Sequence, residues 1–213
     1  MLTLPLRDLF RDLENVDRYA TAEVGVREAP EWIPGTDLLA PARPPFSDLL
    51  RRIGTRMGLA DRRSVAASFL LRFGWSSGPA IALYLAKGVV PRLRLEQTSY
   101  RFSESTLFER IALHDATIDG AADGPRRLRE TLVGQTAPVI DALHDWSRMT
   151  RPGLWGQVTS SWGAQFLAMA ARLRGQAAGV SEAEQFFAGD DFVSLTQPRF
   201  YAVTQEGRTK YFH

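Results

Sequence analysis

The chain has 213 residues, 45% of them apolar and 23% charged, which is enough to bury a hydrophobic core and is typical of a water-soluble globular protein. Its formal net charge is only +2, although 24 arginines against two lysines raise the isoelectric point to about 9.2, and no basic run interleaved with aromatic residues indicates a nucleic-acid partner. The absence of cysteine from all 213 residues excludes disulfides, thiolate catalysis and cysteine-ligated metal sites within them.

The first 60 residues are predicted to form a helical and proline-rich segment, to which we assign no role. Apolar residues recur at helical spacing among charged ones in residues 1–20, which predicts an amphipathic helix. Five prolines between residues 27 and 46 favour a loop, and a second amphipathic helix is expected over residues 46–57. The N-terminal residues offer neither the apolar stretch nor the cleavage site of a signal peptide, so we expect a cytoplasmic protein.

Residues 61–213 are expected to form the functional body, which begins with two helices. Asp61 is a suitable N-cap for a helix over residues 62–73. A serine followed by Pro79 is typical of the beginning of the next helix, because proline fits the first helical turn. Gly88 provides the C-terminal stop of that helix.

Two uncharged stretches have a length that invites comparison with membrane spans. Residues 73–86 are too few to cross a bilayer, and residues 152–171 contain several polar side chains and three glycines. We therefore expect no transmembrane segment, while peripheral association with a membrane is left open.

After Pro91 the apolar spacing changes from helical to alternating, which predicts a small antiparallel sheet. Leucines alternate with arginines over residues 92–95, and aromatic residues alternate with polar ones over residues 99–102. A further strand is expected over residues 107–113. A turn-rich linker over residues 120–125 leads into the C-terminal half.

The C-terminal half is predicted to contain helices and a final hairpin. One helix is expected over residues 128–146, broken at Pro138, and another over residues 154–173. Ser181, with a glutamate three residues later, is typical of the capping box that begins a helix. Alternation over residues 200–212 predicts a β-hairpin. The expected fold class is therefore α+β and mainly helical, with a small antiparallel sheet element and a C-terminal β-hairpin.

Two His-Asp pairs make a metal-dependent hydrolase one of the hypotheses. The sequence Ala-Leu-His-Asp occurs at residues 112–115 and again at residues 142–145. Imidazoles and carboxylates bind the divalent cations that activate water in metal phosphohydrolases. On a helix, Asp141 would share one face with His144 and Asp145. Surface or helix-capping roles are the alternative interpretation of these residues.

Basic residues gather in the predicted hairpin. Arg199, Arg208 and Lys210 could attract an anionic substrate or an acidic electron donor, or they could be a solvated edge that protects the hairpin from aggregation. Trp155 has the helical spacing of a core residue but could also line an apolar pocket. Together with Tyr201, these residues are the candidates for binding a substrate or partner. We assign no catalytic and no metal-ligating residue.

Three blocks of sequence, in consistent order, carry a resemblance to a known family. They are Arg-Arg-Ser-Val-Ala-Ala-Ser-Phe-Leu-Leu at residues 62–71, Gly-Val-Val-Pro-Arg-Leu at residues 88–93, and Leu-Trp-Gly-Gln-Val-Thr-Ser-Ser at residues 154–161. In this order they resemble the ferric iron reductase family typified by FhuF. The resemblance covers roughly residues 60–213 and leaves the N-terminal segment unmatched.

The resemblance implies a redox function for the intact protein. In that family the helical body is followed by four cysteines that bind a [2Fe–2S] cluster, and residues 197–203 and 207–213 are similar to the segment that leads into them. A [2Fe–2S] cluster is thus expected if the protein extends past His213. The implied reaction is one-electron reduction of Fe(III) bound by hydroxamate or catecholate oxygens, which releases Fe(II) because the siderophore holds it less strongly.

The partners implied by the resemblance are a ferric siderophore and an electron donor. A relative that has lost its redox chemistry is the alternative, in which the same body is a cysteine-free siderophore-binding or interaction module.

Overall fold

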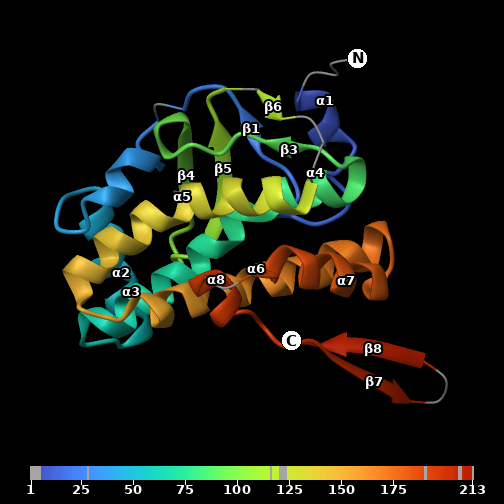
Figure 1. Cartoon of the computed structure of the whole chain (residues 1–213). Helices are drawn as coiled ribbons and strands as arrows, with labels where there is room; N and C mark the ends of the chain where they lie inside the picture. Colours follow the sequence, from blue (N-terminus) through green and yellow to red (C-terminus); the bar gives the residue numbers. More distant parts are fainter. Residues whose placement is uncertain are drawn as a thin grey trace.

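The computed structural model describes residues 6–27, 29–115, 117–119, 124–189, 191–205 and 208–212. Helices form most of this structure, and a small sheet and a hairpin accompany them (Figure 1). The helices are α1 (Leu6–Arg11), α2 (Phe46–Met57), α3 (Arg62–Phe73), α4 (Gly78–Lys87), α5 (Gly124–Ser147), α6 (Arg151–Leu173), α7 (Gln176–Phe187) and α8 (Phe192–Leu195), with 3₁₀ turns η1 (Gly35–Leu39), η2 (Gly74–Ser77) and η3 (Leu95–Gln97). The expected α+β, mainly helical class is confirmed.

The strands form one four-stranded sheet and two short pairs. They are β1 (Glu23–Val24), β2 (Trp32–Pro34), β3 (Val90–Pro91), β4 (Thr98–Phe102), β5 (Phe108–Leu113), β6 (Ile118–Asp119), β7 (Tyr201–Gln205) and β8 (Arg208–Phe212). The sheet has the order β1-β5-β4-β2, in which β4 is antiparallel to both neighbours and β1 is parallel to β5. The sheet is therefore mixed, and its parallel edge strand comes from the N-terminal segment.

The N-terminal helix is much shorter than the amphipathic pattern predicts. Helix α1 ends at Arg11 and the chain continues in turns, in one of which the carboxylate of Asp17 accepts a hydrogen bond from the amide of Tyr19 at 2.9 Å. The apolar spacing nevertheless reports burial correctly, since Phe10 and Leu13 are both in the core. The apolar residues after residue 11 are therefore buried by packing against the core, although the chain there is no longer helical.

Helices α2 and α3 have the predicted bounds. Gly58 ends α2 with a left-handed φ of +64°, a conformation that glycine adopts without strain. The carboxylate of Asp61 caps α3 by accepting the amide of Ser64 at 3.0 Å. Gly88 ends α4 in the same way as Gly58 ends α2, as predicted.

The strand predicted over residues 92–95 is wrong. Strand pairing in this region is limited to β3, which pairs with β6, and the chain then enters the 3₁₀ turn η3. Leu93 and Leu95 are buried whereas Arg92 and Arg94 are exposed, so the alternation is real. It reflects an extended segment lying on the core without a partner strand, which periodicity alone does not distinguish from a strand.

Two boundary predictions in the C-terminal half are also wrong. Helix α5 runs through Pro138 without a break, because buried residues on both sides, Thr136 and Val139, hold it against the core. Helix α7 begins at Gln176, so Ser181 and its capping-box partner lie inside the helix. In the first turn of the helix, α7 packs tightly on α6, since a Cβ at Gly179 would lie 2.1 Å from the Cβ of Ala170.

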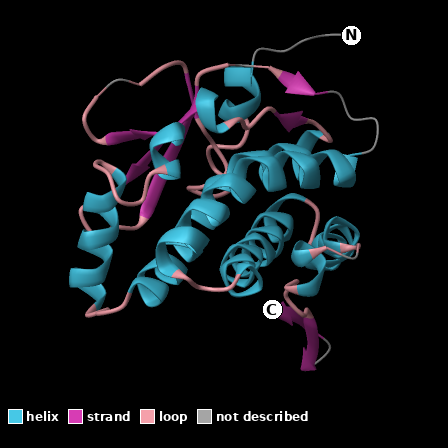
Figure 2. Cartoon of the chain, turned by 60° about the vertical axis from the view of Figure 1, so that its left-hand side comes forward, coloured by secondary structure: helices cyan, strands magenta, loops and turns pink. Residues whose placement is uncertain are grey.

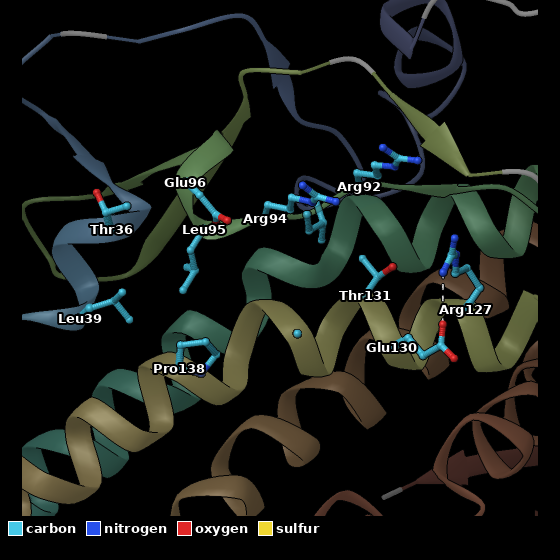
Figure 3. A pocket seen from close by; sticks show the side chains of 12 residues that line it. Thr36, Leu39, Arg92, Arg94, Leu95, Glu96, Arg127, Glu130, Thr131 and Pro138 are labelled. Carbon is cyan, nitrogen blue, oxygen red and sulfur yellow. Dashed lines mark hydrogen bonds and ion pairs between the residues drawn. The ribbon is translucent and has the colours of Figure 1, made fainter.

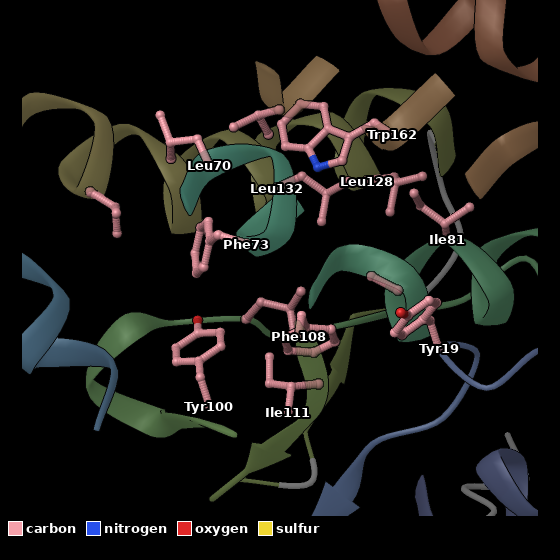
Figure 4. Packing of buried hydrophobic residues seen from close by; sticks show 14 of the residues in the cluster. Tyr19, Leu70, Phe73, Ile81, Tyr100, Phe108, Ile111, Leu128, Leu132 and Trp162 are labelled. Atoms are coloured by element: carbon pink, nitrogen blue, oxygen red, sulfur yellow. The ribbon is translucent and has the colours of Figure 1, made fainter. Parts of the chain in front are cut away.

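Helix α6 is the centre of the hydrophobic core and contacts α3, α4, α5 and α7. The ring of Trp162 lies edge-on to Phe186 of α7, with centroids 5.6 Å apart. Figure 4 shows Trp162 on the helical side of this core and Tyr100 and Ile111 on the sheet side. Apolar residues from the first 60 positions belong to the same cluster, so the division at residue 60 does not separate two hydrophobic cores. Among the described residues, no helix is both long and apolar enough to cross a membrane.

Candidate functional site

The C-terminal hairpin projects from the helical body (Figures 1 and 2). Strands β7 and β8 are antiparallel, with Tyr201 opposite Phe212 and Val203 opposite Lys210. Since opposite residues and alternate residues share a face, Tyr201, Val203 and Lys210 lie on the same face of the hairpin. Tyr201 is 56% exposed and Val203 is 52% exposed, so this face combines accessible apolar surface with a cation.

A hollow of about 300 Å³ lies at the base of the hairpin, between α6 and the segment that leads into β7. We call it the hairpin-foot hollow. Its lining residues are Gly156, Ser160, Thr196, Pro198, Arg199 and Tyr201. A Cβ at Gly156 would meet no atom within 4 Å, so the missing side chain keeps this wall of the hollow open.

Two sets of hydrogen bonds hold the base of the hairpin against the body. Thr159 of α6 donates its hydroxyl to the carbonyl of Thr196 at 2.6 Å. Arg129 of α5 donates to the carbonyl of Phe186 at 2.6 Å and also binds the carboxylate of Asp191. Burial opposes ionisation of Asp191, but the hydrogen bonds from Arg129 and Ser194 outweigh it and lower the pKa of Asp191.

The structure brings together some of the predicted site residues but not all. Arg199 and Tyr201 line the hairpin-foot hollow, and Lys210 lies on the face of the hairpin that carries Tyr201. Trp155 is only 5% exposed and packs edge-on against another tryptophan of α6, so it is a core residue. The backbone of Arg208 belongs to β8, but its side chain lies outside the described part of the chain.

A larger cavity, of about 590 Å³, lies between η1, the β3–η3 connection and α5 (Figure 3). We call it the arginine groove. Its lining residues are Thr36, Leu39, Arg92, Leu93, Arg94, Leu95, Glu96, Arg127, Glu130, Thr131, Gly134 and Pro138. Sequence reasoning missed this groove because its walls come from three distant segments. The one available signal was the exposed arginine pair beside two buried leucines.

The His-Asp pairs serve separate local contacts. His114 bonds through Nε2 to the hydroxyl of Ser99 at 2.9 Å, and His144 bonds through Nδ1 to the carbonyl of Met149 at 2.6 Å, beyond the end of α5. Within the described ranges, no three His, Asp or Glu side chains gather in an arrangement that could hold a metal ion. The hydrolase hypothesis gains no support from this geometry.

The residues present do not fit the [2Fe–2S] cluster that the resemblance implies. Such a cluster is held by thiolates, and the 213 residues contain no cysteine. We therefore derive no electron-transfer step within this chain.

In comparisons with known proteins, no family model and no curated protein sequence matches the chain.

Proposed function

We propose that this chain is a ferric-siderophore-binding body related to the ferric iron reductases, and that the siderophore complex docks at the hairpin-foot hollow. One observation supports this assignment above others. Two segments that resemble the family, residues 154–161 and 197–203, both contribute lining residues to this hollow. The first contributes Gly156 and Ser160, and the second contributes Arg199 and Tyr201.

The chemistry of the hollow suits an anionic iron complex. The guanidinium of Arg199 and the ammonium of Lys210 lie on exposed surface, where they can attract negative charge. Tyr201 offers an aromatic face for a catechol ring, and Ser160 offers a hydroxyl donor. A volume of about 300 Å³ accommodates one arm of a large ligand, with the remainder resting against the hairpin. Ferric tricatecholate complexes, which are strongly anionic, are the preferred class.

Reduction of the bound iron would require electrons from a separate donor. The residues of this chain can bind and orient the complex, but none supplies a redox group. The basic face of the hairpin also suits an acidic electron donor. A cytoplasmic location, expected from the N-terminal sequence, would bring the released Fe(II) directly to cytoplasmic acceptors.

Calorimetric titration of the full chain with a ferric tricatecholate tests this function. Arg199→Gln should weaken binding about tenfold, because it removes one charge-assisted contact. Gly156→Leu should abolish binding by filling the open wall. Arg63→Gln, which removes an exposed guanidinium from α3, is the matched control and should bind like the wild type. Equal affinity in all four proteins, or no binding by the wild type, would show that the hollow is not a siderophore site.

A further inference from the structure

One end of the arginine groove is cationic. Arg94 lies along the β3–η3 connection, Arg127 points toward it from α5 on the opposite side, and Arg92 is a further lining residue, at the rim (Figure 3). Arg92 and Arg94 cannot turn inward, because the neighbouring leucines occupy the core. Leu93 and Leu95 are only 4% and 5% exposed. The alternation therefore keeps the guanidiniums of Arg92 and Arg94 on the exposed side of this segment, at the rim of the groove.

Guanidiniums outnumber carboxylates among the residues that line the groove. The groove is lined by three guanidiniums and by two carboxylates, those of Glu96 and Glu130. Glu130 is already engaged, by Arg127 at 3.3 Å and by Arg126 at 3.8 Å. Arg94 is exposed, and its guanidinium makes no ion pair or hydrogen bond with the described residues. Its planar guanidinium is suited to bidentate binding of a carboxylate or phosphate.

The other end of the groove is apolar and open. Leu39, Leu95 and Pro138 lie there, and Leu39 is 43% exposed (Figure 3). Between the two ends, a Cβ at Gly134 would meet no atom within 4 Å, so the surface of α5 is recessed. Pro138 has no amide hydrogen, which leaves the carbonyl of Gly134 without its usual helical donor. The wall thus also carries a hydrogen-bond acceptor that a ligand hydroxyl or amine could reach.

From this geometry we infer that the arginine groove is a second ligand site, specific for small organic anions that carry an acidic group on an apolar body. The acidic group lies against Arg94 with Arg92 and Arg127 around it, and the apolar body lies along Gly134 toward Pro138. The volume of about 590 Å³ is that of an ordinary small-molecule site. This site is independent of the hairpin-foot hollow and of siderophore binding.

The matched probes 2-naphthoate and 2-naphthamide test the site, because they share one shape and differ in charge. Titration of the isotopically labelled full chain, followed by amide NMR, should show 2-naphthoate shifting the amides of Thr131 and Gly134. The neutral amide should bind about tenfold more weakly. Arg94→Gln should weaken 2-naphthoate binding about tenfold and remove its preference over the amide. Arg63→Gln is the matched charge control and should change neither.

A pair of glycine substitutions separates this site from the hairpin-foot hollow. Gly134→Leu should abolish binding of 2-naphthoate and leave siderophore binding intact. Gly156→Leu should abolish siderophore binding and leave binding of 2-naphthoate intact. Thermal melts check the folding of both variants, which we expect to be retained because a Cβ at either position meets no atom within 4 Å. The inference is overturned if 2-naphthoate does not shift Thr131 and Gly134, if the neutral probe binds as tightly, or if Arg94→Gln and Gly134→Leu bind like the wild type.

Discussion

Asp61 shows how a single side chain fixes the beginning of a helix in this protein. Its carboxylate accepts the amide of Ser64 at 3.0 Å and the hydroxyl of Ser64 at 2.7 Å. The side-chain hydrogen bond from Ser64, followed by the backbone one, favours the ionised form and lowers the pKa of Asp61 below its ordinary value of 3.8. The ionised carboxyl therefore contributes to the stability of the folded state.

The lowered pKa of Asp61 predicts a loss of stability in acid. The contribution is fully present above pH 3.8, the ordinary value, and is lost as the pH falls through the lower pKa of the folded state. Asp61→Asn keeps a capping oxygen but cannot titrate, so its melting temperature should approach that of the wild type as the pH falls below 3.8. Asp61→Ala should melt lower than the wild type at neutral pH. If the difference in melting temperature between the wild type and Asp61→Asn stays constant as the pH falls below 3.8, the capping role of the ionised Asp61 carboxylate is contradicted.

Local signals such as this one could be predicted from the sequence because their partners are near in the chain. Asp61 and Gly88 act on residues within one helical turn, and both were placed correctly. Ser181 fits the same kind of local pattern but is not a cap, because α7 already begins at Gln176 and its first turn packs on α6 through Gly179 and Ala170. Tertiary contact overrides a local capping preference where the two conflict.

At the scale of elements, Arg129 joins α5 to the connection between α7 and α8. Its guanidinium donates to the carbonyls of Phe186 and Ala188 at 2.6 and 3.1 Å, and its side chain is 14% exposed. These partners lie 57 and 59 residues further along the chain, so no local pattern could identify them. The arginine also positions the segment that precedes the hairpin, through Asp191 and Ser194.

Replacement of Arg129 by methionine should destabilise the protein by about 2 kcal/mol, because two carbonyls lose their donor while the aliphatic packing is kept. Asp191 is half exposed, so its share of the loss is reduced by solvent. Arg126→Met, one turn away and 71% exposed, is the control and should cost no more than about 0.5 kcal/mol. Urea unfolding measures both. Equal losses in the two variants would show that Arg129 is only a surface residue.

At the scale of the whole molecule, neighbouring helices support the two candidate sites. Helix α6 provides one wall of the hairpin-foot hollow, and α5 provides one wall of the arginine groove. The sequence groups Arg199 and Tyr201 at a common site because they are only two positions apart in the chain. For Trp155 it leaves open a core and a pocket position, and it does not reveal the arginine groove, since both depend on segments that meet only after folding.

The most direct test of the account is to locate a bound siderophore on the full chain. Gallium(III) replaces iron(III) in a tricatecholate complex without paramagnetic broadening, so amide NMR can map its contacts. We predict that shifts centre on Gly156, Ser160, Thr196 and Tyr201, and that Arg199→Gln reduces them. Shifts centred on Thr131 and Gly134, or no shifts at all, would contradict siderophore binding at the hairpin foot.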